Sequence, residues 1–230
     1  MNPLQNCKNI YFIGIGGIGM SALARYFNKQ GVVVSGYDKT PTLLTDALIK
    51  EGIQIHFEDD LTKIDKQASV IVYTPAIPSN HGELNYFKEN GYLVVKRSDV
   101  LQWITENAFT IAIAGTHGKT TTTSMTAHIL RHTGYGCNAF LGGIASNYGT
   151  NFWSHEKNVV VVEADEYDRS FLKLAPNIAV ITAVDPDHLD IYGTAEEVVK
   201  AFGEFSDKIK TGGWLIRKWN TVFKTLESNK

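Results

Sequence analysis

The chain has 230 residues, of which 43% are hydrophobic and 20% charged, and its formal net charge at pH 7 is -2. This composition is typical of a globular protein with enough apolar material for one large core or two medium ones. The basic and acidic residues form no long run of one sign, which argues against nucleic acid or a membrane as a partner and favours small molecules. No apolar run approaches the ~20 residues that cross a bilayer, and Cys7 and Cys137 have neither metal-ligand nor disulfide-framework spacing. We therefore expect a cytoplasmic protein.

The first half of the chain alternates short apolar runs with helical patterns. Ile10 to Ile13 is an apolar run that ends in glycines, and a helical spacing of apolar residues then reaches Phe27. The sequence further predicts strands over 32–34, 69–73 and 92–95, and helices over 41–50, 83–89 and 99–106. Strands that alternate with helices in this way predict a parallel sheet covered by helices.

A second strand-loop-helix unit begins after the polar segment Thr105-Glu106-Asn107, and we place a domain boundary near Asn107. The sequence predicts strands over 109–114, 159–162 and 178–182, and helices over 119–132 and 195–209. Continuous Val and Ile runs are typical of strands that are buried on both faces, so a parallel sheet is predicted again. The expected domains are residues 1–107 and 108–230, both of the α/β class.

The segment Gly14-Ile15-Gly16-Gly17-Ile18-Gly19 has the pattern G-x-G-x-x-G between a predicted strand and a predicted helix. Its glycines permit a tight turn and bring backbone N–H groups close to a diphosphate. Asp38, at the end of the next strand, could accept a hydrogen bond from a ribose hydroxyl. The same glycines could instead serve only close strand-helix packing, and the motif does not specify the nucleotide. A nicotinamide oxidoreductase is a distant alternative, because no hydride-transfer constellation follows.

After the apolar run Ile111 to Ala114, the segment Gly115-Thr116-His117-Gly118-Lys119-Thr120-Thr121 predicts a phosphate-binding loop. It departs from G-x-x-x-x-G-K-[ST], because Ile113 stands where the first glycine is expected. In such loops backbone amides bind phosphate oxygens, the lysine neutralises the β and γ phosphates, and the hydroxyl ligates Mg2+. We expect ATP or GTP to bind here; the alternative is a solvated Lys119 at the start of a helix.

Two predicted strands of the second domain end in ionisable residues, in the segments Glu163-Ala164-Asp165-Glu166-Tyr167-Asp168 and Asp185-Pro186-Asp187-His188-Leu189-Asp190. The carboxyl ends of parallel strands meet at one edge of a sheet, where ligands bind. Glu163 is the first candidate for an Mg2+ ligand. His188 could ligate a second Mg2+ or donate a hydrogen bond to a phosphate. Glu166 and Asp168 fit a solvated loop at least as well as a functional role.

Taken together, these motifs closely resemble those of the Mur ligase family of peptidoglycan synthesis. The resemblance rests on Gly14 to Gly19, Ala114 to Thr123, Glu163 to Glu166 and Asp187 to Asp190, in that order, and it reaches about Leu215. It implies a Rossmann-like parallel-sheet domain that binds UDP, followed by an incomplete P-loop α/β ATPase domain. The family's C-terminal, amino-acid-binding domain has no counterpart among these residues.

For the first domain, the resemblance implies that the ligand is UDP-N-acetylmuramate, with its diphosphate facing the glycine loop. The residues implied in this binding are Gly14, Gly16, Gly17, Ile18, Gly19, Asp38, Thr74, Pro75 and Ala76. The segment Leu141 to Asn151 resembles the family segment that approaches the muramoyl group, and its alternative is a glycine-rich surface loop.

For the second domain, the resemblance implies that ATP phosphorylates the muramoyl carboxylate and that an amine then displaces phosphate. Lys119 would stabilise the phosphoryl group in transfer, Thr120 and Glu163 would hold the Mg2+ of ATP, and His188 would help to hold a second Mg2+. The residues implied in ATP binding are Gly115, Thr116, His117, Gly118, Lys119, Thr120 and Thr121.

Within the family, the segment Ser170 to Pro176 looks more like the branch that adds L-alanine than the branch that adds a recycled tripeptide to UDP-muramic acid. The resemblance therefore implies an ATP-dependent, amide-forming ligation of L-alanine to UDP-N-acetylmuramate, in a truncated chain. The sister ligase remains an alternative. So does a fragment that binds the UDP-sugar and ATP without turnover.

Overall fold

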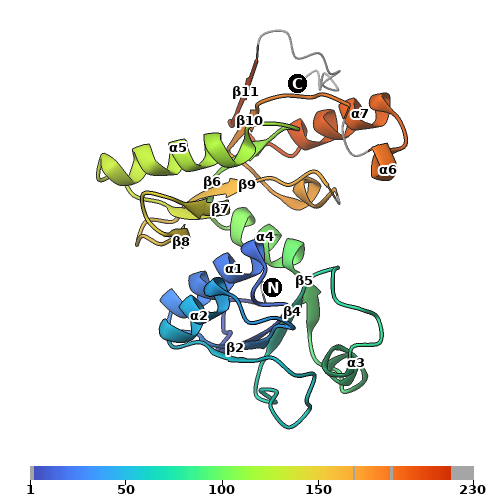
Figure 1. The fold of residues 1–230 in the computed structure, drawn as a ribbon. Helices are drawn as coiled ribbons and strands as arrows, with labels where there is room; N and C mark the ends of the chain where they lie inside the picture. Colours follow the sequence, from blue (N-terminus) through green and yellow to red (C-terminus); the bar gives the residue numbers. More distant parts are fainter. Residues whose placement is uncertain (1–2, 168, 187–188, 219–230) are drawn as a thin grey trace. The chain divides into compact units, whose positions relative to one another are not determined.

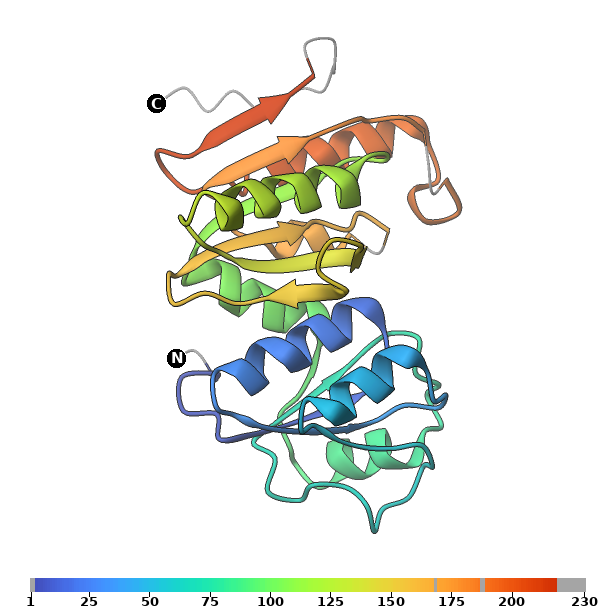
Figure 2. The ribbon, with the colours of Figure 1, turned by 60° about the vertical axis from the view of Figure 1, so that its left-hand side comes forward.

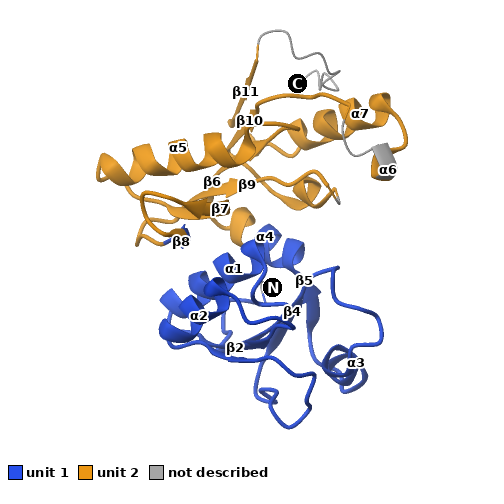
Figure 3. Cartoon of the chain, viewed as in Figure 1, with its two compact units in different colours: residues 1–103, 151–153 blue, residues 104–150, 154–230 orange. Residues whose placement is uncertain are grey.

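The structure is a computed structural model that describes residues 3–167, 169–186 and 189–218. The chain divides into two compact units, one of residues 1–103 with 151–153 and the other of residues 104–150 with 154–230 (Figure 3). The units part between Trp103 and Ile104, within helix α4 (Arg97–Glu106). Among the described helices, none combines the length and the apolar character that a bilayer crossing needs.

The first unit contains a five-stranded parallel sheet with the order β3-β2-β1-β4-β5 (Figure 1). Its strands are β1 (Asn9–Ile13), β2 (Val33–Tyr37), β3 (Gln54–His56), β4 (Val70–Tyr73) and β5 (Val94–Lys96). Helices α1 (Ile18–Lys29) and α2 (Leu43–Lys50) cover one face, and α3 (Gly82–Glu89) covers the other. The sequence prediction of a parallel α/β sheet is confirmed.

Helix α2 begins two residues later than the sequence predicts, because a capping box fixes its start. The Thr45 backbone N–H donates to the Thr42 hydroxyl at 3.2 Å, and the Thr42 backbone N–H donates to the Thr45 hydroxyl at 2.8 Å. These two bonds satisfy N–H groups that a helix start leaves without an intrahelical partner. Pro41 and Thr42 therefore precede the helix.

The second sheet has six strands in the order β11-β10-β6-β9-β7-β8. Its strands are β6 (Phe109–Ala114), β7 (Asn138–Ala145), β8 (Thr150–Trp153), β9 (Val159–Glu163), β10 (Ile178–Ile181) and β11 (Trp214–Arg217). Helix α5 (Lys119–His132) packs on β6, β9 and β7, and in Figure 2 it lies in front of this sheet, with α7 (Ala195–Ser206) behind it. A short 3-10 helix, η1 (Ser170–Lys173), and helix α6 (Leu189–Tyr192) complete the described elements.

Strands β3, β7 and β8 are among the elements that the sequence does not predict. The segment from Leu141 to Asn151, for which a surface loop was one interpretation, is strand at both ends, since 141–145 belongs to β7 and 150–151 to β8. Glycines weaken a strand pattern, but β7 is held by parallel pairing with β9, with Phe140 opposite Val162. Tertiary pairing therefore overrides the local preference of this segment.

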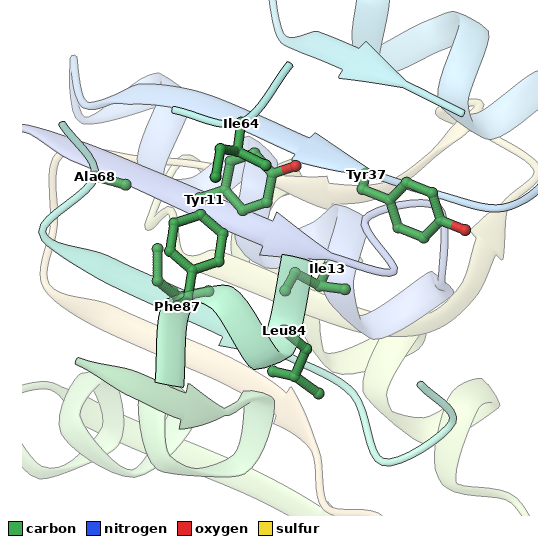
Figure 4. Close-up of a cluster of buried hydrophobic side chains, with 8 residues drawn as sticks. Tyr11, Ile13, Tyr37, Ile64, Ala68, Leu84 and Phe87 are labelled. Atoms are coloured by element: carbon green, nitrogen blue, oxygen red, sulfur yellow. The ribbon is translucent and has the colours of Figure 1, made fainter. Parts of the chain in front are cut away.

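The face of the first sheet that lies under α3 carries a hydrophobic cluster (Figure 4). Tyr11 and Ile13 project from β1 toward Leu84 and Phe87 of α3, and Ile64 lies beside them. The ring centroids of Tyr11 and Phe87 are 5.2 Å apart. This apolar packing surrounds the Tyr11 hydroxyl, which therefore needs a polar partner within the core.

That partner is the fully buried carboxylate of Glu83, whose Oε2 accepts a hydrogen bond from the Tyr11 hydroxyl at 2.7 Å. The His56 Nε2 atom lies 2.7 Å from the same hydroxyl, and the Asp60 backbone N–H donates to Glu83 Oε1 at 3.2 Å. Burial raises the pKa of Glu83 from 4.5 to about 7, although both hydrogen bonds oppose the shift. The folded chain therefore holds a proton on Glu83 more tightly than the unfolded chain does.

This raised pKa predicts a stability contribution that is present below pH 4.5 and is lost as the pH rises through about 7. Between pH 5 and pH 8, we expect the free energy of unfolding of the wild type to fall by on the order of 2 kcal/mol more than that of Glu83→Gln. The variant lacks the loss because its side chain does not titrate. Urea unfolding at both pH values measures the difference. Glu89→Gln, an exposed change on the same helix, is the control, and a pH dependence unchanged by Glu83→Gln would contradict the assignment.

Candidate functional site

The first glycine loop turns the chain sharply away from the end of β1. The backbone N–H groups of Gly14 and Ile15 both donate to the Tyr37 carbonyl oxygen, at 2.8 and 3.0 Å. Gly14 has a φ of 87°, which favours glycine, and α1 begins four residues later. The loop therefore lies where β1 has β2 on one side and β4 on the other. In open α/β sheets this reversal of strand order is where nucleotides bind.

The Asp38 carboxylate holds this loop from the end of β2. Its Oδ2 accepts a hydrogen bond from the Gly16 backbone N–H at 2.7 Å, and its Oδ1 accepts one from Thr40 at 3.1 Å. A Cβ on Gly16 would lie 2.8 Å from Asp38 Oδ2, so the absence of a side chain at Gly16 permits the contact. Each carboxylate oxygen has a further lone pair, which leaves Asp38 able to accept a hydrogen bond from a ligand hydroxyl.

Two further strands bring side chains to the same loop. Thr74, Pro75 and Ala76 follow β4 in a turn closed by the Ile77 N–H, which donates to the Thr74 carbonyl at 3.1 Å, and a Cβ on Gly14 would lie 2.8 Å from Thr74 Cγ2. Arg97 follows β5, and a Cβ on Gly19 would lie 2.8 Å from its Nη1. The sequence interpretation missed Arg97. A basic residue directly after a parallel strand was the signal that could have identified it.

The second glycine loop follows β6 and is hydrogen-bonded to the residues that follow β10. Gly115 has a φ of 133° and Gly118, the N-cap of α5, a φ of 79°. The Thr116 N–H donates to the Ala183 carbonyl at 3.0 Å, and the Thr182 hydroxyl donates to the Ala114 carbonyl at 3.1 Å. A Cβ on Gly115 would lie 2.1 Å from the Thr182 hydroxyl oxygen. Both glycines are therefore required by backbone conformation, and Gly115 also by close contact.

Three ionisable or hydroxyl side chains that the sequence predicts for the ATP site meet at this loop. The Thr120 hydroxyl donates to Glu163 Oε1 at 3.1 Å, and the Gly142 N–H donates to Glu163 Oε2 at 3.0 Å. The Lys119 ammonium donates to the Gly115 carbonyl at 2.9 Å. Burial raises the pKa of Glu163, against the hydrogen bonds from Thr120 and Gly142 and the charge of Lys119. A nearby cation would therefore favour the ionised carboxylate.

A hydroxyl and a carboxylate are oxygen ligands of the kind that Mg2+ prefers, and protein Mg2+ sites commonly use one or two carboxylates together with substrate phosphates. Thr120 and Glu163 fit that pattern. Among the residues that the structure describes, no group of three or more His, Cys, Asp or Glu side chains could hold a metal ion. His188, the other predicted ligand, lies outside the described residues.

The remaining predicted loop residues differ in their exposure. The Thr116 hydroxyl accepts a hydrogen bond from the Asp185 N–H at 3.1 Å and is buried. His117 is exposed, with its Nε2 3.8 Å from Asp185 Oδ2, and Thr121 is exposed on the first turn of α5. Thr116 therefore fixes the loop to the segment after β10, whereas His117 and Thr121 are open to solvent.

The interpretation of Glu166 as part of a solvated loop is wrong. Its side chain is 1% exposed, and Oε1 lies 2.8 Å from the Lys119 ammonium. After β9 the chain forms a turn in which the Phe171 N–H donates to the Asp165 carbonyl at 3.2 Å. Glu166 lies in this turn, and its side chain reaches Lys119 of the phosphate loop. An acidic run directly after a buried strand was the available signal, but it did not single out this residue. Asp168 lies outside the described residues.

The close approach of Gly142 to Glu163 gives a testable prediction. A Cβ on Gly142 would lie 2.2 Å from Glu163 Oε2, whereas a Cβ on Gly143 would make an ordinary contact of 3.5 Å with Thr120 Cγ2. We expect Gly142→Ala to displace the carboxylate and to weaken Mg2+-dependent ATP binding about ten-fold, as outer-shell changes at metal sites do. Calorimetry with and without Mg2+ measures this, with Gly143→Ala as the matched control. Equal affinities in the two variants would contradict the role of Glu163.

Family models match both units of the chain. The model described as Mur ligase family, catalytic domain, matches residues 9–108, and the Mur ligase middle domain matches residues 113–228. The chain is 56% identical over 218 residues to the UDP-N-acetylmuramate–L-alanine ligase of Porphyromonas gingivalis, which covers 92% of this chain and 48% of the relative. The corresponding protein of Phocaeicola vulgatus is 54% identical over 219 residues, which are 93% of this chain and 48% of the relative. The chain thus spans about half the length of these curated relatives.

Solved structures show the same similarity. The UDP-N-acetylmuramate-alanine ligase of Thermotoga maritima matches with a TM-score of 0.82 and 31% identity, over 94% of this chain and 50% of that one. The UDP-N-acetylmuramate:L-alanyl-gamma-D-glutamyl-meso-diaminopimelate ligase of Neisseria meningitides matches with a TM-score of 0.84 and 26% identity, over 93% of this chain and 72% of that one. The motifs, the two sheets and both family models agree, and the chain belongs to the Mur ligase family.

Proposed function

We propose that this chain supplies the UDP-sugar site and the phosphate loop of an ATP-dependent ligase that joins L-alanine to UDP-N-acetylmuramate. The observation that carries the proposal is the arrangement of Lys119, Thr120 and Glu163 at one edge of the second sheet. An ammonium, a hydroxyl and a carboxylate there match the groups that bind ATP phosphates and their metal ion. The proposed substrates are those for which the related ligases of Porphyromonas gingivalis and Phocaeicola vulgatus are named.

In the second unit, the proposed reaction activates a carboxylate with ATP and forms an amide from the acyl phosphate. The backbone amides of Gly115 to Thr121 and the N-terminus of α5 would bind the phosphates, because both present N–H groups to an anion. Lys119 would offset the charge of the phosphoryl group in transfer. Thr120 and Glu163 would hold Mg2+, which neutralises charge on the β and γ phosphates when bound. His188 is proposed to help to hold a second Mg2+.

In the first unit, the glycine loop would bind the diphosphate of the UDP-sugar. The N–H groups of the Gly14 to Gly19 segment lie at the start of α1, where the helix dipole favours an anion. Arg97 lies beside Gly19 and would add positive charge. Asp38 would accept a hydrogen bond from a ribose hydroxyl, and the Thr74 turn would border the same site. We propose the first unit as the sugar-nucleotide domain and the second as part of the ATPase domain, in a cytoplasmic enzyme.

The sister activity, which adds a peptide to the same sugar nucleotide, is the second candidate. The Neisseria meningitides structure supports it, because its TM-score of 0.84 is as high as that of the alanine-adding enzyme at 0.82. The sequence favours L-alanine, since the curated relatives with 56% and 54% identity are both named for that substrate. The fold of these two units matches both solved ligases about equally well.

The proposed division of labour is tested by Lys119→Ala. We expect this variant to weaken ATP binding about 10- to 100-fold, because it removes a charged hydrogen-bond donor to the phosphates. Its affinity for UDP-N-acetylmuramate is expected to equal that of the wild type. Isothermal titration calorimetry of the 230-residue chain with each ligand measures both values. Lys208→Ala, which removes an exposed lysine of the same unit, is the control.

Three results would contradict the proposal. Loss of UDP-N-acetylmuramate binding in Lys119→Ala would show that the two sites are not divided as proposed. A wild-type chain that binds neither ligand would exclude both the ligase role and the role of a binding fragment. Tight binding of NADH in place of the UDP-sugar would support a nicotinamide enzyme instead.

A further inference from the structure

The second unit buries a negative charge directly beside its phosphate loop. Glu166 is 1% exposed, and its Oε1 accepts a hydrogen bond from the Lys119 ammonium at 2.8 Å. A buried carboxylate next to a site for ATP would repel the triphosphate unless its charge were compensated. Lys119 provides that compensation, so the acid and the loop lysine form one ion pair.

The lysine is held by acceptors from two separate segments. Its ammonium donates to Glu166 Oε1 and also to the Gly115 carbonyl at 2.9 Å. The side chain therefore runs back across the loop, from the first residue of α5 to the first residue of the loop. An ammonium has three N–H donors. The two bonds made within the described part of the chain leave a third donor for a phosphate oxygen.

Glu166 is itself fixed by its backbone. Its carbonyl oxygen accepts hydrogen bonds from the Tyr192 hydroxyl at 2.6 Å and from the Arg169 N–H at 3.0 Å. The next turn is anchored by Phe171, which is fully buried and stacks on Phe205 of α7 with ring centroids 5.1 Å apart. A carboxylate on such a support can hold a flexible partner in one position.

We propose that Glu166 is a positioning residue for Lys119, which holds the ammonium over the phosphate loop before ATP arrives. A free lysine side chain has many accessible rotamers and loses that freedom when it binds, whereas a side chain that is already ordered loses less of it. The inference rests on the proposed function of the second unit as an ATP site. In this role Glu166 acts on ATP binding only through Lys119 and does not contact the nucleotide.

A double-mutant cycle tests this assignment. ATP affinity is measured by calorimetry in the presence of Mg2+ for the wild-type chain, Glu166→Gln, Lys119→Met and the double variant. Glu166→Gln keeps the shape of the side chain and removes its charge, and we expect it to weaken ATP binding about five- to ten-fold in the wild-type background. In the Lys119→Met background the same change is expected to leave the affinity unchanged or to increase it, because only the repulsive charge of Glu166 then remains.

The controls separate this proposal from a structural role. Glu156→Gln removes an equal charge from the surface of the same unit and should leave ATP affinity unchanged. Thermal unfolding checks that each variant is folded, and Glu166→Asp, which keeps the charge but shortens its reach, provides a second series with the same expected dependence on Lys119. The inference would be overturned, with the proposed ATP site unaffected, if Glu166→Gln weakened ATP binding by the same factor in the wild-type and Lys119→Met backgrounds. Tighter ATP binding in both backgrounds would overturn it too. A wild-type chain that does not bind ATP would contradict the proposed function and the inference together.

Discussion

The parallel pairing of β6 with β9 is the constraint on which the second site depends. Ile113 of β6 lies opposite Glu163 of β9 in this register. The phosphate loop begins two residues after Ile113, so this register places Glu163 beside the start of the loop. A slip of one residue would turn the Glu163 side chain to the opposite face of the sheet. The hydrogen bond from Thr120 to Glu163 is therefore a consequence of strand pairing, and the approach of Gly142 follows from the pairing of β7 with β9.

The chain uses the same structural device twice, with different chemistry. In each unit a glycine loop joins an inner strand of the sheet, β1 or β6, to the helix that follows it, α1 or α5. The loop therefore lies at the carboxyl end of a parallel strand, where ligands bind in α/β sheets. The first loop is held by the Asp38 carboxylate and has Arg97 beside it, a combination suited to holding a ribose and its diphosphate. The second has Lys119, Thr120 and two acids, which suits a phosphate in transfer. In the proposed function, the side chains of the two loops, and not their fold, would determine which loop binds the sugar nucleotide and which takes part in the reaction.

Much of this arrangement is predictable from the sequence because it depends on local patterns. Both glycine loops, the helix that follows each one and the buried valines of β9 have periodicity or composition that identifies them. Strand β7 could not be predicted, because its glycines are typical of a loop and only pairing with β9 makes it a strand. Arg97 and Glu166 were missed for a related reason. Their places after a strand were a signal, but their contacts with Gly19 and Lys119 depend on distances across the unit, which no spacing along the chain encodes.

In the proposed ligase, the segment from Gly115 to Thr121 would hold the phosphates of ATP, with Thr120 and Glu163 at the metal ion. A crystal structure of the chain grown with ADP and Mg2+ tests it most directly. We expect the β-phosphate on the backbone amides of this loop, with the Lys119 ammonium in contact with it and the metal ion held by Thr120 and Glu163. Phosphates of ADP bound at the Gly14 to Gly19 loop, with none at Gly115 to Thr121, would contradict it.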